Sequence, residues 1–258
     1  MDNCRPLILI VNDDGVDAPG VNHLAEYVCS LGEVYIVAPD SSQSGQSAAM
    51  TVKSPLRVIE KESKVNGIRI FTVNGTPVDC VKMAINAIIP RRPTVVLAGI
   101  NHGSNFGVNI TYSGTMGAVL EGCIEGIPSV GFSLANNSLE ADFSPFTKII
   151  VDIAVEVITN GLPEGICLNV NIPSCDRPKG IRVCRAVRGK YIDGYMRYSD
   201  PDGIPFYWLT GKFENFEPDV KDTDFYWLKQ DYISIVPIKC DLSAKNYIKY
   251  LAKRFNAY

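Results

Sequence analysis

Short apolar runs alternate with helical patterns of apolar residues through the first two thirds of the chain. Six short segments have the apolar character of buried strands: residues 7–11, 34–38, 69–73, 94–98, 127–132 and 167–172. Four longer segments repeat apolar residues at helical spacing: residues 19–31, 78–89, 112–125 and 146–159. This alternation favours a parallel sheet covered on both faces. With right-handed crossovers it predicts a mostly parallel, doubly wound, Rossmann-like α/β fold.

Polar and glycine residues mark the ends of the predicted helices. Gly32 is a stop signal after the first helix. Thr76 and Pro77 are suited to the N-cap and first position of the second helix. Ser113 or Thr115 is a plausible cap for the third. These signals agree with the apolar periodicity about where each helix begins.

The pattern changes from about Cys184 onward. Residues 191–227 are rich in aromatic residues, Asp, Gly and Pro and lack clear helical periodicity, which predicts hairpins or an arm that packs on the core or on a second subunit. A strand over residues 232–238 and a helix over 243–255, capped by Ser243, complete the chain. We therefore expect a single domain over residues 1–258, with a core in 1–184 and the arm, returning strand and final helix in 185–258.

Composition narrows the class of protein. The chain has 258 residues, of which 46% are hydrophobic, and a net charge of −3, as expected for a globular protein. The mild acidity disfavours binding to polymeric nucleic acid, which requires a concentrated basic surface. The apolar run at residues 7–11 is too short for a signal peptide, and no run approaches the roughly 20 apolar residues that span a bilayer. We expect a cytoplasmic protein without membrane contact.

Scarce histidine limits the possible chemistry. The two histidines, His23 and His102, are too few for a histidine-rich zinc hydrolase and stand in no H-E-x-x-H or Ser-His-Asp context. The eight cysteines form no C-x-x-C pair, which favours reduced, mostly buried thiols. A catalytic metal would therefore be held mainly by oxygen.

Polar segments follow several of the predicted strands. These segments are residues 12–15, residues 40–45, residues 99–105 and the helix start at 113–115. Because the carboxyl ends of parallel strands meet at one edge of a sheet, we expect the segments to converge there. The sequence thus predicts one ligand site at this edge.

Asp13-Asp14 is the first anchor of that site. Adjacent carboxylates repel each other unless a cation or a proton lies between them, although a plain turn followed by a helix also accounts for them. Together with Ser44 and Asn101 they would form an oxygen site suited to Mg²⁺, Mn²⁺ or Ca²⁺. For Ser44, ordinary loop polarity remains the alternative.

The Ser113-Gly114-Thr115 segment offers backbone N–H groups and hydroxyls to an anion, or simply caps a helix. The chain contains neither a P-loop nor a dinucleotide-binding fingerprint after its first strand. His102 could be a general acid, could orient a neighbouring ligand or could be a neutral loop residue. His23 is expected to be a packing or surface residue.

Several motifs stand together in an order that resembles the SurE family of stationary-phase survival proteins. They are residues 11–20 (VNDDGVDAPG), 37–40 (VAPD) with Ser44-Gly45, 74–80 (NGTPVDC), 99–101 (GIN) and 112–115 (YSGT). The resemblance extends to Thr223-Asp224 and to residues 232–237 (YISIVP), so it covers nearly the whole chain.

The resemblance implies a metal-dependent nucleotidase that hydrolyses nucleoside 5′- and 3′-monophosphates, with short polyphosphate as a further expected substrate. It implies one divalent ion per subunit, Mg²⁺ or Mn²⁺, held by Asp13, Asp14, Ser44 and Asn101. It also implies a homodimer or homotetramer formed by exchange of C-terminal arms.

On this basis we interpret the remaining polar residues of the edge as contacts for the substrate. The expected phosphate-binding residues are Asn12, Gly45, Asn105, Ser113, Gly114 and Thr115. Asp13 and Asp14 are the expected catalytic residues; one of them either positions and deprotonates water or attacks phosphorus. We favour water, because carboxylates tied to a metal are poor nucleophiles.

The chain departs from the family pattern at two places. Residues 41–43 read Ser-Ser-Gln where many members carry basic residues, and His102 stands where a small residue is common. Three rival hypotheses remain: a haloacid-dehalogenase-like phosphatase, a non-catalytic nucleotide or metabolite binder, and a structural oligomer. The first needs a D-x-D spacing that the adjacent Asp13-Asp14 lacks.

Overall fold

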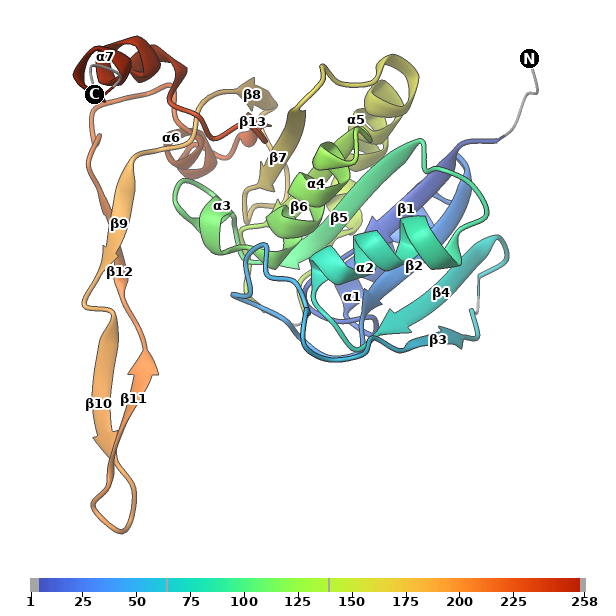
Figure 1. Cartoon of the computed structure of the whole chain (residues 1–258), viewed down its shortest axis with the longest axis horizontal. Helices are drawn as coiled ribbons and strands as arrows, with labels where there is room; N and C mark the ends of the chain where they lie inside the picture. The colour runs from blue at the N-terminus through green and yellow to red at the C-terminus, as the bar shows by residue number, and fades with distance from the viewer. Residues whose placement is uncertain (1–4, 64, 139, 256–258) are drawn as a thin grey trace.

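A computed structural model describes residues 5–63, 65–138 and 140–255 (Figure 1). Within these residues the central sheet has nine strands in the order β3-β4-β2-β1-β5-β6-β7-β13-β8. The strands are β1 (Leu7–Val11), β2 (Glu33–Pro39), β3 (Val58–Lys61), β4 (Ile68–Val73), β5 (Val95–His102), β6 (Ser129–Leu134), β7 (Ile166–Ile172), β8 (Ile181–Val183) and β13 (Ile233–Lys239). Only β3 against β4 and β13 against β7 pair antiparallel in this sheet, which confirms the expected mostly parallel arrangement in the described chain.

Helices cover both faces of the sheet. They are α1 (Pro19–Val28), α2 (Pro77–Met83), α3 (Asn109–Tyr112), α4 (Gly114–Ile124), α5 (Thr147–Asn160), α6 (Asp224–Lys229) and α7 (Lys245–Phe255). In β1, Ile8 and Ile10 pack with α1 and α5 in one core, whereas Leu7, Leu9 and Val11 pack with α2 and α4 in the other. Because successive strand residues point to opposite faces, a fully apolar strand serves both cores. The doubly wound, Rossmann-like class is therefore confirmed.

Most expected elements are found, with shifted ends. The second predicted helix continues past Met83 as a π-helical turn, Ala84–Ile88, and the last one begins at Lys245 rather than at Ser243. The sequence pattern missed four of these elements: β3, β8, α3 and α6. Strand β3 is a mostly exposed edge strand, and α6 is a single short helix, capped by the Thr223 side chain, inside the aromatic segment expected to hold hairpins.

The expected arm is one long hairpin, made of two successive two-stranded sheets, that extends away from the body of the molecule (Figure 1). Strand β9 (Gly189–Ile192) pairs with β12 (Lys212–Asn215), and β10 (Tyr195–Ser199) pairs with β11 (Pro205–Leu209). All ten residues of β10 and β11 are exposed. The arm therefore presents apolar side chains that the chain itself does not cover.

The described cysteines are all free. Three are buried and four are partly exposed, so the expected burial holds only in part; Cys4 lies outside the described residues. None of the described helices has the length and apolar character needed to cross a membrane.

The start of α2 is fixed by a buried capping box. The Asp79 carboxylate accepts hydrogen bonds from the Thr76 N–H at 2.9 Å and from the Thr51 N–H at 3.1 Å. The Thr76 hydroxyl accepts one from the Asp79 N–H at 3.2 Å. Burial alone would raise the pKa of Asp79, but the hydrogen bonds from Thr51 and Thr76 outweigh it and lower that pKa. The same residue thus caps the helix and secures the segment that leads from β2 to β3.

We predict that Asp79→Ala lowers the free energy of unfolding by roughly 1–3 kcal/mol at neutral pH, because the buried Thr76 N–H and the partly buried Thr51 N–H lose their acceptor. The lowered pKa means that the carboxylate stabilises the fold above about pH 4 and that this contribution is lost as the pH falls further. Urea unfolding at pH 7 and below pH 4 measures both effects. Asp152→Ala, which removes an exposed partner of Lys148, is the control and should cost under about 0.5 kcal/mol. Equal losses in the two variants would contradict the prediction.

Candidate functional site

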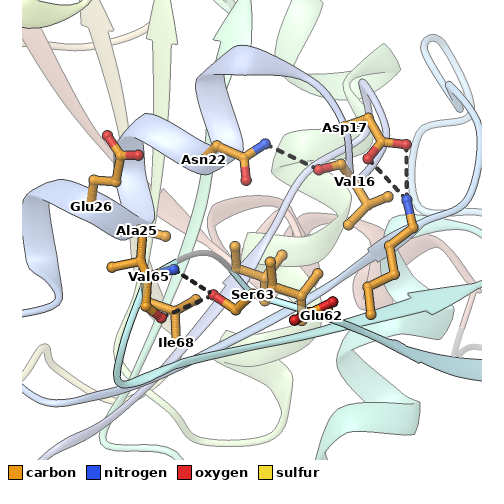
Figure 2. A pocket seen from close by; sticks show the side chains of 12 residues that line it. Val16, Asp17, Asn22, Ala25, Glu26, Glu62, Ser63, Val65 and Ile68 are labelled. Carbon is orange, nitrogen blue, oxygen red and sulfur yellow. Dashed lines mark hydrogen bonds and ion pairs between the residues drawn. The ribbon is translucent and has the colours of Figure 1, made fainter.

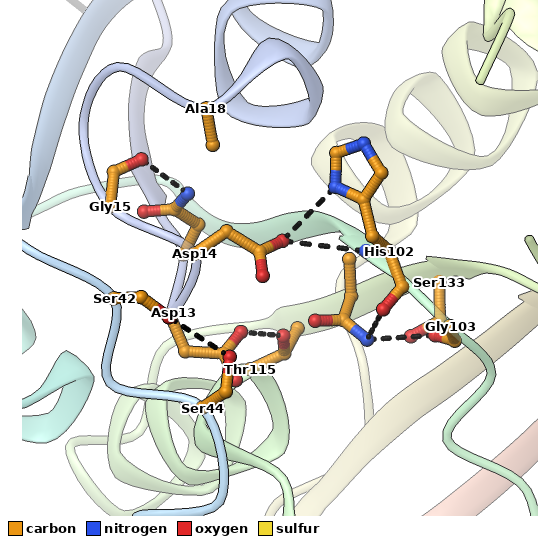
Figure 3. Close-up of polar contacts among 12 residues, drawn as sticks. Asp13, Asp14, Gly15, Ala18, Ser42, Ser44, His102, Gly103, Thr115 and Ser133 are labelled. Atoms are coloured by element: carbon orange, nitrogen blue, oxygen red, sulfur yellow. Dashed lines mark hydrogen bonds and ion pairs between the residues drawn. The ribbon is translucent and has the colours of Figure 1, made fainter. Parts of the chain in front are cut away.

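Asp13 is buried between the end of β1 and the beginning of α4. Its side chain is only 4% exposed, and its Oδ1 accepts a hydrogen bond of 2.5 Å from the Thr115 hydroxyl. A Cβ added at Gly114 would lie 2.7 Å from the Cβ and 3.0 Å from the Oδ2 of Asp13, so glycine is needed for this close approach. Two segments about a hundred residues apart in the sequence are thus brought into contact, as expected for one sheet edge (Figure 3).

The surroundings of Asp13 make its ionisation costly. Burial raises the pKa of Asp13 to about 6; the Thr115 hydrogen bond opposes the rise, and the negative charge of Asp14 adds to it. The N-terminus of α4, which begins beside this carboxylate, favours negative charge through its free N–H groups. A carboxylate held in this way is stabilised by any cation that binds next to it.

Asp14 is oriented by His102. The Asp14 Oδ2 accepts a hydrogen bond of 3.3 Å from the His102 backbone N–H and lies 3.4 Å from the His102 Nδ1 (Figure 3). The His102 ring is packed edge-on against Phe143, with ring centroids 5.3 Å apart. Of the three roles left open for His102, this geometry favours orienting the neighbouring carboxylate. His23 packs against Tyr27 and Phe143 and is partly exposed, as expected for a packing or surface residue.

Asn101 and Ser44 complete the expected ligand set. The Asn101 Nδ2 donates to the carbonyl oxygens of His102, at 3.3 Å, and Gly103, at 2.7 Å, so the amide is held and its Oδ1 is left for a ligand. Ser44 is exposed on the loop after β2, and its hydroxyl lies 3.1 Å from that of Ser42. The loop itself is tied to the site, because the Gln43 N–H donates to the Asp13 carbonyl oxygen at 2.7 Å.

These donors fit a hard divalent cation. They comprise two carboxylates, an amide oxygen and a hydroxyl, and the described groups of the edge offer no thiol. Asn12, 1% exposed, donates through its Nδ2 to the Gly15 carbonyl oxygen, yet its Oδ1 is buried without a partner among the described residues. A cation bound nearby would offset both the missing hydrogen bond of this buried oxygen and the cost of ionising the neighbouring Asp13 carboxyl.

A cavity of about 390 Å³ opens beside Asp14. Its lining consists of Asp14, Gly15, Val16, Asp17, Ala18, Pro19, Asp40, Ser41, Ser42 and His102. The size lies in the range of small-molecule sites. Three of the lining residues are aspartates and none is Lys or Arg, so a phosphate ester placed there requires a bound cation.

The expected phosphate-binding residues differ in exposure and in the hydrogen bonds that they already make. Ser113 caps α4, its Oγ accepting from the Met116 N–H at 3.1 Å, and the Thr115 hydroxyl is engaged by Asp13. Gly45 has a positive φ of 79° and open space around it. Asn105 is buried: its N–H donates to the Asn171 Oδ1 at 2.6 Å, and its Nδ2 donates to the Ser133 Oγ at 2.9 Å.

The residues that hold Asn105 were not anticipated. Asn169 donates to the Asn105 carbonyl oxygen at 2.8 Å, and both Asn169 and Asn171 are fully buried on β7. Their signal is present in the sequence, because asparagines at alternate positions of an apolar strand place two polar groups on one face. The pattern therefore marks a polar network that supports the edge of the sheet.

Asp224 was also missed as a support of the site. This fully buried carboxylate accepts hydrogen bonds from the N–H groups of Gly107 at 2.8 Å, Val187 at 2.9 Å and Phe225 at 2.8 Å. Burial raises its pKa, and the three hydrogen bonds oppose the rise. Through Asp224 the C-terminal part of the chain holds the loop that follows Asn105.

A second cavity, of about 360 Å³, shares Val16 and Asp17 with the first one (Figure 2). It is lined by Val16, Asp17, Asn22, Ala25, Glu26, Ile36, Lys61, Glu62, Ser63, Val65, Ile68 and Ile70. Lys61 is the one basic residue in this lining, and its Nζ already pairs with the Asp17 carboxylate at 2.9 Å. None of the expected ligands Asp13, Asp14, Ser44 and Asn101 lines this cavity, so we do not include it in the candidate site.

Comparison with known proteins identifies the family. Residues 8–193 match the family model described as "Survival protein SurE". The chain is 45% identical over 240 residues to the 5′-nucleotidase SurE of Phocaeicola vulgatus, covering 93% of each chain. It is 46% identical over 257 residues to the 5′-nucleotidase SurE of Christiangramia forsetii, covering 98% of each. The crystal structure of the SurE protein from Aquifex aeolicus superposes with a TM-score of 0.82 at 37% identity, over 96% of this chain and 99% of that one. The chain belongs to the SurE family.

Proposed function

We propose that this protein is a metal-dependent phosphomonoesterase that hydrolyses nucleoside 5′-monophosphates to nucleoside and phosphate. The observation that carries the proposal is the pair Asp13-Asp14 beside a cavity of nucleotide size that lacks Lys and Arg. Relatives named 5′-nucleotidase SurE, alike over nearly their full length, support the same reaction. Nucleoside 3′-monophosphates and short polyphosphate are the further substrates that we include in the proposal.

We assign one divalent ion per subunit, Mg²⁺ or Mn²⁺, to Asp13, Asp14, Ser44 and Asn101. The donor chemistry supports this set, since all four supply oxygen and the carboxylates gain most from a cation. Bound there, the ion supplies the positive charge that stabilises a phosphoryl group during transfer.

We assign separate roles in the reaction to Asp13, to Asp14 and to the start of α4. Asp13 is held by Thr115 and the start of α4, which fixes it in place and suits it to positioning rather than attack. Asp14 is more accessible, with a side chain 18% exposed, and His102 fixes its orientation, so it is placed to accept a proton from water. The start of α4, with Ser113 and Gly114, offers N–H groups to phosphate oxygens. Asn12, Gly45 and Asn105 are further proposed contacts for the substrate.

We propose that the chain forms one SurE-like domain, with residues 1–184 as the catalytic core and 185–258 as the arm, returning strand and final helix. An isolated two-stranded hairpin is marginally stable in water. The exposed aromatic and apolar side chains of β10 and β11, among them Trp208 and Leu209, therefore favour cover by a second copy. A homodimer or homotetramer built by arm exchange satisfies this requirement.

Phosphate release from a panel of nucleoside monophosphates and short polyphosphate, with Mg²⁺ or Mn²⁺, tests the proposed activity. We expect turnover that chelator abolishes without unfolding the protein. Asp14→Asn should lower kcat at least about 100-fold, because one ligand and proton acceptor is lost. Asp152→Asn, which changes an exposed carboxylate on α5 that does not line the cavity, is the matched control and should retain activity. Tight nucleotide binding without phosphate release would instead support a non-catalytic binder.

A second prediction concerns the buried carboxylate in metal-free protein. Because the folded-state pKa of Asp13 is raised to about 6, the wild-type fold loses stability as the pH rises from about 4 through 6. With chelator present, Asp13→Asn should therefore raise the free energy of unfolding at pH 8 by up to about 3 kcal/mol, and the gain should vanish near pH 4. Added Mg²⁺ or Mn²⁺ should stabilise the wild type and not the variant. Urea unfolding of the wild type, of Asp13→Asn and of the control Asp152→Asn measures these changes. An Asp13→Asn variant that is less stable than the wild type at pH 8 would refute the prediction.

The arm gives a third prediction. The double substitution Trp208→Glu with Leu209→Glu should lower the molar mass measured by light scattering, because it places charges on the surface that a second copy would cover. The control is Val52→Glu, which changes an exposed apolar residue outside the arm and should leave the molar mass unchanged. Far-ultraviolet circular dichroism checks that all variants fold. An unchanged mass for the arm variant would rule out assembly through β10 and β11.

A further inference from the structure

Three cysteines from separate elements meet in the body of the protein. Cys123 lies near the end of α4, Cys167 lies on β7, and Cys240 follows the last residue of β13. Their three Sγ atoms all lie within 4.8 Å of one another, and all three thiols are free. Cys123 and Cys167 are buried, whereas Cys240 is partly exposed. The three thiols therefore form a cluster that solvent reaches through Cys240. The other described cysteines are not part of such a cluster.

This cluster lies away from the candidate nucleotidase site. Cys167 is the second residue of β7, at the strand end opposite to the edge where Asp13 lies. Cys123 is near the far end of the 11-residue helix whose first residues contact Asp13, so the rise of the helix from Gly114 to Cys123 separates the two places by roughly 13 Å. The cluster takes no part in the mechanism above.

We propose that Cys123, Cys167 and Cys240 form a second metal site, which binds one thiophilic d¹⁰ ion, such as Zn²⁺ or Cu⁺, through three thiolates. Soft sulfur donors select such ions and reject Mg²⁺ and Mn²⁺. A metal–sulfur bond of about 2.3 Å sets neighbouring sulfurs roughly 4 Å apart, so the present spacing needs to close by less than about 1 Å. No described His, Asp or Glu joins the group, which leaves three-coordination for Cu⁺, or water as the fourth ligand of Zn²⁺.

Binding at this site must release protons. Burial raises the pKa of the Cys167 thiol well above its usual range and that of Cys240 to about 12, so these two thiols are protonated at neutral pH in the metal-free protein. When an ion binds, three S–H bonds break, three metal–sulfur bonds form and three protons pass to solvent. The affinity therefore rises with pH, and the protons provide a count of the thiolates formed.

The surroundings of the three cysteines offer a path for an ion and connect the cluster to several elements of the fold. A cavity of about 210 Å³ that includes Cys123 in its lining lies between residues 126–128 and 162–166. The Cys240 N–H donates to the Gly165 carbonyl oxygen at 3.0 Å, which places Cys240 beside the same loop. A bound ion would join α4, β7 and the end of β13, so it should raise the unfolding temperature according to its concentration.

Titration of the reduced full-length protein with Cd²⁺ tests the site, because thiolate-to-cadmium charge transfer absorbs in the ultraviolet and oxygen-bound Cd²⁺ does not produce this band. We expect a band that saturates at one ion per chain, with three protons released in weakly buffered solution. Cys240→Ser and Cys123→Ser should lose most of the band. Cys29→Ser, at a partly exposed cysteine on another element, and Asp14→Asn, at the nucleotidase site, should keep it.

X-ray absorption of the zinc-loaded Asp14→Asn protein gives a count of sulfur neighbours that needs no cysteine variant. Three sulfurs would support the site even if a cysteine variant failed to fold. Fewer than three sulfurs, no charge-transfer band in the wild type, or a band retained by both Cys240→Ser and Cys123→Ser would overturn the proposal. A parallel titration with Cu⁺ against a competing chelator shows which d¹⁰ ion is bound more tightly.

Discussion

The active edge depends on a carboxylate that is buried where its charge is costly. Asp13 follows the central strand β1, which is flanked by β2 and β5, so the loops after all three strands end around it. The approach of α4 is possible because Gly114 has no side chain, and it delivers both the Thr115 hydroxyl and the positive end of a helix. These groups offset only part of the burial cost, since the pKa still rises to about 6. The remaining imbalance is the reason we propose a cation at this edge, and that cation would supply the positive charge that a phosphate ester requires.

The sequence predicted the fold well where burial dominates and poorly where it does not. The six core strands are continuous apolar runs because helices cover both faces, and each was found within a few residues of its expected ends. Strand β3 carries Val-Ile-Glu-Lys at the sheet edge and is mostly exposed, so no burial pattern marks it. Helix α6 has six residues, too few for periodicity, so the sequence pattern did not mark it. The hydrophobic pattern predicts elements whose side chains are buried on a regular face, and it does not predict elements that are mostly exposed or very short.

The site was predictable as a set of loops but not as a set of contacts. Strand order follows from topology, so Asp13 and Thr115 could be expected at one edge before any distance was known. Which partner holds each group depends on long-range packing: Asn105 is held by Asn171, and the nearby Gly107 by Asp224, from the C-terminal part of the chain. Such pairings have no spacing rule. The contact between His102 and Asp14 is of the same kind, since adjacency to Asn101 alone left three roles open.

Helix α4 connects two chemically different places. Its first turn contacts hard oxygen donors around Asp13, and its last turn carries Cys123 into a group of soft sulfur donors. Imidazole, which accepts ions of both kinds, is nearly absent from the chain, and the described His102 contacts Asp14 rather than the sulfurs. Because no intermediate ligand joins the two sets, an ion suited to one is poorly held by the other. With both proposed sites occupied, the scarcity of histidine would let an oxygen site for Mg²⁺ or Mn²⁺ and a thiol site for a d¹⁰ ion share one helix with little competition for the same metal.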